Sequence, residues 1–171
     1  MTWTSANLLF GQCATFSPDF LRMTIHWTTK PFAALTLAEL YALLQLRSEV
    51  FVVEQTCAFQ DIDGQDQVAL HLLGTTEAGE LAAYARLFEA GRSYAQASIG
   101  RVVTSPRHRG HGLGRQLLHE AIAQCEAQFG RQPIKIGAQQ YLLDFYQSFG
   151  FVVEGEGYLE DGIPHVHMVR P

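Results

Sequence analysis

Apolar residues recur at helical spacing in two long stretches of the chain and gather in several short runs between them. The first helix is expected to begin after Thr36, because Thr36 and Glu39 have the spacing of a capping box, in which each side chain binds the other residue's backbone N–H. The positions predicted to face the core follow at intervals of three, four and seven residues: Leu37, Leu40, Leu44 and Phe51. Arg47 lies on the same stripe, and its side chain is expected either to extend along the edge of the core or to point into a pocket.

A second and longer helix is predicted from about Gly112 to Phe129. Its apolar stripe comprises Leu113, Leu117, Leu118, Ala121, Ile122, Cys125 and Phe129. Gly130 stands where glycine commonly ends a helix. A third, short helix is expected over about Leu142–Phe149, and it is followed by Gly150.

Short runs of apolar and β-branched residues predict the strands of a sheet. They are expected at Thr24–Trp27, Val68–Leu73, Leu81–Leu87, Ser98–Thr104, Ile134–Ala138, Phe151–Val153 and His165–Met168. This order of strands and helices is typical of an α/β or α+β domain with a mixed sheet. We assign that single domain to residues 23–171, and we assign residues 1–22 to an N-terminal extension that is either an arm or a non-native start.

Composition and charge narrow the class of protein. A chain of 171 residues with 47% hydrophobic and 17% charged residues has the length and composition of one globular domain. The net charge of −5 argues against a nucleic-acid-binding protein, and no apolar run reaches the ~18–20 residues that cross a membrane. Three widely spaced cysteines fit neither a zinc site nor a disulfide framework, so a cytoplasmic protein is expected. Asp61–Asp66 lacks the glycine and glutamate of a calcium loop at the required positions, which predicts a polar turn and no metal.

The segment Ile99–Gly114 carries the strongest chemical signal. It is a strand, a short loop and a helix start, with glycines at Gly110, Gly112 and Gly114. Glycines let the backbone approach a ligand closely, and free N–H groups at a helix start, together with Arg107 and Arg109, attract anions. The arrangement suits a pyrophosphate, although its spacing matches neither a Walker loop nor a dinucleotide-binding loop. A glycine-rich turn without a ligand is the alternative.

Two motifs resemble the GNAT superfamily of N-acetyltransferases. Arg109–Gly114 matches the acetyl-CoA signature Q/R-x-x-G-x-G/A, and Asp144–Phe151 is similar to the F-Y-x-x-x-G-F segment near the C-terminus of these proteins. Further segments narrow the resemblance to the ElaA branch: Leu43–Gln55, Asp61–Gly64, Ile99–Val102, Gly137–Gln139 and Glu160–His165. The resemblance covers residues 23–170.

This resemblance implies a mixed, mostly antiparallel sheet that is splayed between two central parallel strands and flanked by helices, with acetyl-CoA in the opening. Pantetheine would pair with the main chain of Val102, Val103 and Thr104, and the Val102 N–H would polarise the thioester carbonyl. The pyrophosphate would contact Arg109, Gly110, His111, Gly112, Leu113 and Gly114. Phe145 would lie beside the pantetheine, and Tyr146 would protonate the departing thiolate.

The acceptor side is less closely defined by the resemblance. The candidates for the base that takes the amine proton are Glu54, His71, His165 and a water held by Gln139. His71 would otherwise be an ordinary core histidine. Contacts to the acceptor are expected from Arg47, Arg101, Gln139, Asp161 and His165, and the two arginines would suit a carboxylate.

The predicted function is transfer of an acetyl group from acetyl-CoA to the amine of an unidentified small-molecule or peptide acceptor, by direct attack in a ternary complex. A non-catalytic CoA-binding sensor on the same fold is the alternative, and a Rossmann-type oxidoreductase fits the glycine spacing poorly. No nucleic acid, membrane or metal is expected as a partner. A homodimer stays open, because members of this superfamily often dimerise.

Overall fold

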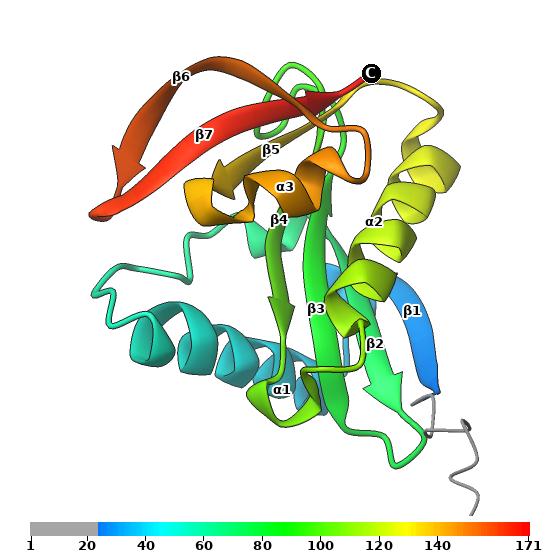
Figure 1. Cartoon of the computed structure of the whole chain (residues 1–171). Coiled ribbons are helices and arrows are strands. Elements are labelled where there is room, and N and C mark those ends of the chain that lie inside the picture. Colours follow the sequence, from blue (N-terminus) through cyan, green and yellow to red (C-terminus); the bar gives the residue numbers. More distant parts are fainter. Residues whose placement is uncertain (1–23) are drawn as a thin grey trace, which may run out of the picture.

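The computed structural model describes residues 24–171, so the extension expected at residues 1–22 lies outside the described part of the chain. Seven strands form one sheet in the order β1-β2-β3-β4-β5-β7-β6 (Figure 1). The strands are β1 (Ile25–Pro31), β2 (Leu70–Thr76), β3 (Leu81–Phe88), β4 (Ala97–Thr104), β5 (Ile134–Gln139), β6 (Val152–Glu160) and β7 (Ile163–Arg170). The α-helices are α1 (Leu37–Arg47), α2 (Leu113–Phe129) and α3 (Leu143–Gln147), and the π-helical segment Ser48–Glu54 continues α1.

The sheet is parted between its two parallel strands. β4 and β5 pair only at Ala97 with Ile134 and at Ser98 with Lys135, whereas every other pair of neighbouring strands is antiparallel. Beyond Ser98 the two strands diverge, because β5 turns away with β7 as its partner (Figure 1). The expected mixed and mostly antiparallel sheet, splayed between two central parallel strands, is confirmed.

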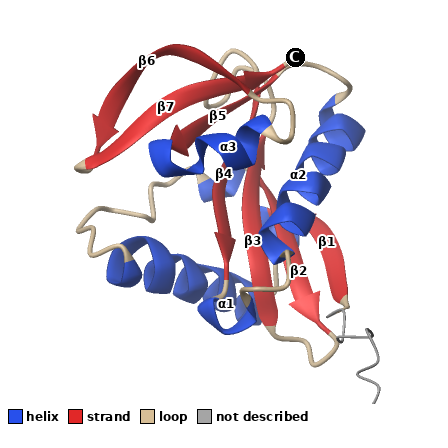
Figure 2. Cartoon of the chain, in the orientation of Figure 1, coloured by secondary structure: helices blue, strands red, loops and turns tan. Residues whose placement is uncertain are grey.

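Helices cover both faces of the sheet (Figure 2). On β3, Ala83, Ala85 and Leu87 belong to the large hydrophobic cluster that α2 and α3 complete, and we call this side the α2 face. Tyr84 belongs to a second cluster with Leu43 and other residues of α1, and we call that side the α1 face. Because side chains alternate along a strand, Arg86 and Phe88 of β3 point to the α1 face together with Tyr84.

The buried face of α1 differs from the sequence prediction. The capping box is present, with the Glu39 N–H donating to Thr36 Oγ1 over 3.2 Å. Leu37, however, is 87% exposed. The residues of α1 and its π-helical extension that are buried are Leu43, Leu46, Arg47 and Val50. The prediction was correct for Leu40, Leu44 and Phe51, which pack against the cluster on the α1 face, and Arg47 is buried on the stripe where the sequence placed it. It was wrong for Leu37, and it missed Leu43, Leu46 and Val50.

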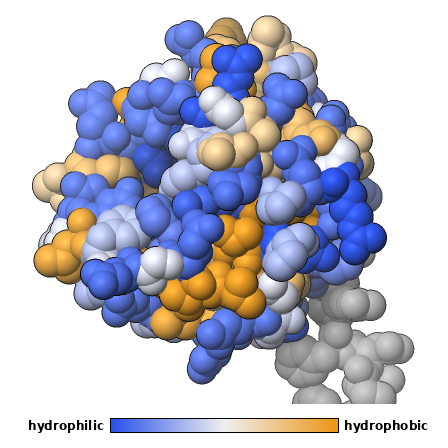
Figure 3. Space-filling model, turned by 90° about the horizontal axis from the view of Figure 1, so that it is seen from above, coloured by the Kyte–Doolittle hydropathy of each residue, from blue (hydrophilic) through white to orange (hydrophobic). Residues whose placement is uncertain are grey.

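The apolar stripe of α2 is confirmed. Its buried residues are Leu113, Leu117, Leu118, Ala121, Ile122 and Cys125, with Phe129 packed beside them. Gly130 ends the helix with a φ of 78°, which a residue with a Cβ adopts rarely. From residue 24 onward, no helix is both long and apolar enough to cross a membrane. Seen from above, polar side chains cover most of the surface, and apolar ones gather in a patch among them (Figure 3).

Candidate active site

A cavity of about 780 Å³ lies where β4 and β5 separate. Many residues singled out in the sequence line it: Glu54, Arg101, Val102, Val103, Thr104, Arg109, Gln139, Tyr146, Asp161 and His165. They come from the π-helical segment, β4, the loop after β4, β5, α3, β7 and the turn before β7. The remaining candidates, Arg47, His71, Phe145 and the turn Gly110–Gly114, are not among its lining residues.

A bulge in β4 shapes the wall of this cavity. β3 pairs Arg86 with Gly100 and Tyr84 with Val103, so Arg101 and Val102 together lie opposite a single residue of β3. Arg101 has a φ of 51°, in the left-handed region, which the bulge requires. On its other side, β4 has no partner beyond Ser98, because β5 has diverged. The backbone of residues 102–104 therefore faces the cavity as a free strand edge, which an extended ligand can pair with.

The glycine-rich turn after β4 leads into the N-terminus of α2. Gly110 and Gly112 have φ values of 95° and 71°, and Gly112 is the N-cap of α2. A Cβ placed on Gly110, Gly112 or Gly114 would meet no atom within 4 Å. Open space in front of the free N–H groups of a helix N-terminus is the geometry that binds phosphate. The turn therefore fits the pyrophosphate of coenzyme A.

Arg109 joins the glycine-rich turn to the cavity. Its Nη1 donates to Glu54 Oε1 over 2.8 Å, and its Nη2 donates to the carbonyl of Thr104 over 3.4 Å. Both partners line the cavity, and both charged side chains are 42% exposed. The guanidinium therefore lies between the free edge of β4 and the start of α2, within reach of an anionic ligand.

Tyr146, on helix α3, also lines the cavity. It is 7% exposed, and burial raises the pKa of its phenol to about 12. The phenol is therefore protonated at neutral pH, as a proton donor must be. Phe145 packs edge-to-face on Tyr146, with ring centroids 5.1 Å apart, and joins the hydrophobic cluster on the α2 face. It fixes the tyrosine ring without lining the cavity itself.

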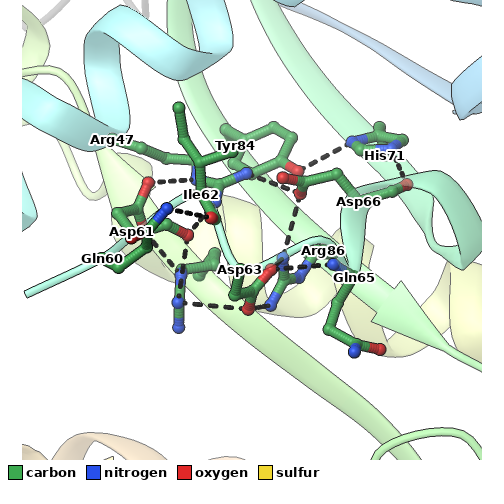
Figure 4. Close-up of polar contacts among 11 residues, drawn as sticks. Arg47, Gln60, Asp61, Ile62, Asp63, Gln65, Asp66, His71, Tyr84 and Arg86 are labelled. Carbon is green, nitrogen blue, oxygen red and sulfur yellow. Dashed lines mark hydrogen bonds and ion pairs between the residues drawn. The ribbon is translucent and has the colours of Figure 1, made fainter.

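Arg47 is fully buried and is bound by carboxylates of the turn Asp61–Asp66, which we call the acidic turn (Figure 4). Its Nε donates to Asp61 Oδ2 over 2.8 Å, and its Nη1 donates to Asp66 Oδ1 over 2.6 Å. Burial by itself lowers the pKa of Arg47, but the hydrogen bond to Asp66 and the charges of Tyr84, Asp61 and Asp66 together outweigh it, so the net effect is a raised pKa. Because its donors are used within the chain, Arg47 holds the turn in place from behind the cavity.

The other two arginines of this cluster line the cavity. Arg86 donates to both oxygens of Asp63, over 2.8 and 2.6 Å, and to Asp66 over 3.0 Å. Arg101 donates from Nε to Asp61 over 2.7 Å. Burial raises the pKa of Asp63, but the hydrogen bonds from Arg86 and from the Gln65 N–H, together with the charges of Arg86 and Arg101, outweigh this effect and lower the pKa to about 2. The expected polar turn is present, and its carboxylates bind arginines.

His71 is fully buried on β2, and both of its ring nitrogens have partners. Nε2 lies 2.9 Å from the carbonyl of Asp66, which only accepts, so Nε2 carries the proton. Nδ1, 2.8 Å from the hydroxyl of Tyr84, is then the acceptor. Burial lowers the pKa of His71 and keeps the ring neutral. Its place in the structure is that of a core histidine that supports the acidic turn.

Three further candidates, Gln139, Asp161 and His165, line the cavity from the C-terminal part of the chain. His165 Nδ1 lies 2.8 Å from the carbonyl of Ile163, so Nδ1 carries the proton and Nε2 keeps its lone pair. Gln139 donates to the side-chain oxygen of Gln55 over 3.2 Å. Asp161 has a φ of 50° in the turn between β6 and β7. Of the candidate bases, His165 is the one with a lining position and a ring nitrogen whose lone pair is free.

Several lining residues were missed by the sequence analysis. They are Gln55, Phe59, Asp63, Arg86, Tyr94 and Ser98. Arg86 could have been suspected, because it interrupts an otherwise apolar strand and three aspartates follow Arg47 within one short segment. No such signal marks Tyr94 or Ser98, since their position depends on where β4 and β5 part.

One thiol lies at this site, because Cys57 lines the cavity and its Sγ donates to the carbonyl of Asp161 over 3.6 Å. Within residues 24–171, no group of three or more histidine, cysteine, aspartate or glutamate residues could hold a metal ion. Cys57 and Cys125 are buried free thiols, and burial raises the pKa of Cys125 to about 12.

Known proteins share this sequence and this architecture. A family model described as the acetyltransferase (GNAT) domain matches residues 41–170. The protein ElaA of Escherichia coli K12 is 45% identical over 148 residues, which cover 85% of this chain and 96% of ElaA. A UPF0039 protein of Synechocystis is 39% identical over 147 residues, covering 86% of this chain and 96% of that protein.

Solved structures agree with these relatives. An acyl-CoA N-acyltransferase from Pseudomonas aeruginosa superimposes with a TM-score of 0.81 and 47% identity, covering 86% of this chain and 100% of that chain. The crystal structure of Escherichia coli ElaA gives a TM-score of 0.80 and 43% identity at the same coverage. The parted sheet, the glycine-rich turn and the sequence likeness all lead to one assignment: the chain belongs to the GNAT acetyltransferase family and is a homologue of ElaA.

Proposed function

We propose that this protein transfers an acetyl group from acetyl-CoA to a primary amine by direct attack within a ternary complex. The observation that carries the proposal is the shared cavity, in which the free edge of β4 and a protonated, buried Tyr146 lie together beside the glycine-rich turn at the start of α2. Membership of the GNAT family supports acyl-CoA-dependent N-acyltransfer as the class of reaction.

Residues of this chain fit the pantetheine, the thioester and the pyrophosphate of acetyl-CoA, which would supply an activated thioester. The main chain of residues 102–104 would pair with the pantetheine, and the Val102 N–H would hydrogen-bond the thioester oxygen. Arg109 and the N–H groups of residues 110–114 would bind the pyrophosphate. Phe145 supports Tyr146 in this arrangement by packing against its ring.

The proton balance of the reaction uses two side chains. The amine nitrogen attacks the thioester carbonyl carbon, the carbon–sulfur bond breaks, and the amine proton passes to Nε2 of His165. Tyr146 gives its phenolic proton to the departing thiolate, and the two residues then exchange protons with solvent. Gln139 and Asp161 flank the amine at the same end of the cavity, while Glu54 orients Arg109.

Thiol release on a panel of primary amines tests this proposal, with calorimetry of acetyl-CoA binding run alongside. We expect saturable binding of acetyl-CoA and saturable release of coenzyme A with at least one class of amine. Saturable binding without release from any amine would overturn the enzyme assignment in favour of a CoA-binding sensor. Absence of binding at millimolar acetyl-CoA would overturn both functions.

A further inference from the structure

The closed end of the cavity contains two buried polar groups that lack partners. Ser98 and Arg86 both line the cavity, and they are 2% and 5% exposed. The hydroxyl of Ser98 and the Nε of Arg86 have no hydrogen-bond partner among residues 24–171. Buried polar groups in folded proteins are nearly always hydrogen-bonded, so two such groups on the wall of one cavity indicate a place for a ligand atom.

Strand pairing brings these two residues to the same face. β3 and β4 pair Phe88 with Ser98 and Arg86 with Gly100, and directly paired residues point to the same side of a sheet. This is the α1 face, where Tyr84 also lies. A Cβ at Gly100 would meet no atom within 4 Å, so open space extends along β4 from Ser98 toward the bulge at Arg101. Ser98 lies at the last paired position of β4 and β5, which closes this space.

The charges around this space select the kind of ligand. The Nη1 and Nη2 atoms of Arg86 are held by Asp63 and Asp66, and the cluster as a whole pairs three arginines with three aspartates (Figure 4). Its charges are balanced, so a further buried carboxylate or ammonium would be uncompensated. What remains is an N–H donor on Arg86 and a hydroxyl on Ser98 that both donates and accepts. Together these groups suit a neutral oxygen.

We propose that Ser98 and Arg86 form a subsite that binds a neutral oxygen, a hydroxyl or an amide carbonyl, carried by the acceptor amine. This inference rests on the proposed function and adds the substrate class: an amine with an uncharged oxygen on the same short chain. Because of the bulge at Arg101 and Val102, the distance from Ser98 to Val102 is counted along β3, from Phe88 to Ala85, which is three residues at about 3.3 Å or roughly 10 Å. Allowing about 3 Å for the contact at each end leaves about 4 Å between amine and oxygen, which roughly three bonds span.

The experiment compares linear amino alcohols of increasing length with alkylamines of the same length, by thiol release from acetyl-CoA. We expect the wild-type kcat/KM to favour the amino alcohol with about three bonds between amine and oxygen over its matched alkylamine by about tenfold, the value of one or two added hydrogen bonds. Ser98→Ala should reduce this ratio to about two, because the hydroxyl that binds the ligand oxygen is gone.

Ser105→Ala is the matched control. Ser105 is 1% exposed and its hydroxyl also has no partner in the described part of the chain, but it follows β4 and does not line the cavity. We expect this variant to keep the wild-type ratio. Equal kcat/KM for amino alcohols and alkylamines in the wild type, or an equal loss of the ratio in both variants, would overturn the subsite and leave the proposed function standing.

Calorimetry separates this inference from the proposed function. If no amine releases coenzyme A, the proposed function fails, and binding of the amino alcohol to the protein saturated with coenzyme A still tests the subsite. A dissociation constant about tenfold weaker in Ser98→Ala than in Ser105→Ala supports the subsite. Equal dissociation constants in the two variants overturn it.

Discussion

Gly114 lacks the backbone strain that explains the two glycines before it. Gly110 and Gly112 have positive φ values, whereas Gly114 lies inside α2, where any residue is tolerated. A Cβ at Gly114 would meet no atom of the described chain within 4 Å. The fold itself therefore does not require glycine there, and close approach of a phosphate is the physical reason that remains.

Gly114→Glu is expected to weaken acetyl-CoA binding about 100-fold, because a carboxylate would lie against the pyrophosphate. The melting temperature should not fall, since glutamate in the first turn of a helix is favourable. Calorimetry and thermal unfolding measure the two effects. Gly114→Gln has the same bulk without the charge and should lose about tenfold; an unchanged affinity in the glutamate variant would contradict phosphate binding at this turn.

Tyr146→Phe is expected to lower kcat about 100-fold with little change in the KM for acetyl-CoA, because a general acid acts in the transition state. Burial raises the pKa of Tyr146 to about 12, so the donor stays protonated throughout the neutral range. The wild-type kcat should therefore not fall below pH 10 through ionisation of this residue. A decrease in kcat near pH 8 or 9 that disappears in Tyr146→Phe would show that the phenol has a lower pKa.

At the scale of elements, α1 and the acidic turn are joined by charge. Arg47 on α1 reaches Asp61 and Asp66 at 2.8 and 2.6 Å, and its side chain is fully buried. Arg101 on β4 reaches Asp61 as well, which connects the turn to the bulge beside the cavity. The cluster thereby holds α1, the acidic turn and β4 together beside the cavity.

Arg47→Met is expected to lower the free energy of unfolding by about 3–5 kcal/mol, because it leaves the buried cluster with three aspartates and only two arginines. Chemical denaturation followed by circular dichroism measures the loss. Lys30→Met removes a pair with Glu39 of similar length, 2.7 Å, but with side chains about 30% exposed, and should cost less than about 1 kcal/mol. Equal losses in the two variants would mean that the buried cluster does not stabilise the fold.

At the scale of the whole molecule, stability against acid depends on Asp63. Its pKa is lowered from 3.8 to about 2 in the folded protein. The unfolded chain therefore binds this proton at higher pH than the folded chain, so the stabilisation is complete above about pH 5 and is lost as pH falls through about 2. Because Asp63 lies at an exposed position, solvent screening keeps its contribution to stability below the roughly 2 kcal/mol that the full shift would give.

Asp63→Asn should therefore unfold with a weaker dependence on pH between 5 and 2 than the wild type. Urea unfolding at a series of pH values gives this slope directly. Glu77→Gln is a suitable comparison, because Glu77 lies in the exposed turn between β2 and β3. If the aspartate and glutamate variants have the same slope, Asp63 does not contribute to acid stability.

Local sequence was sufficient for the elements whose partners are nearby in the chain. The apolar stripe of α2 and its glycine stop were predicted correctly, and so was the capping box of α1. The stripe of α1 was predicted only in part, because Leu37 is exposed and the buried Leu43, Leu46 and Val50 were missed. Arg47, which the sequence placed on the stripe, is held in the core by aspartates 14 and 19 residues further along the chain. β6 was also predicted too short: it extends from Val152 to Glu160 as an edge strand paired with β7, although most of its residues are exposed and polar.

The sequence by itself determined the glycine-rich turn, since strand, loop and helix start are contiguous and their geometry follows from glycine conformation and free N–H groups. It also determined the family to which the chain belongs. Only the tertiary structure decided which side chains line the cavity. Arg47 and His71 are taken into the core, while Arg86 and Ser98 line the cavity, because β4 and β5 part after a single short stretch of pairing. Such a position depends on contacts between distant segments, which no local pattern of residues encodes.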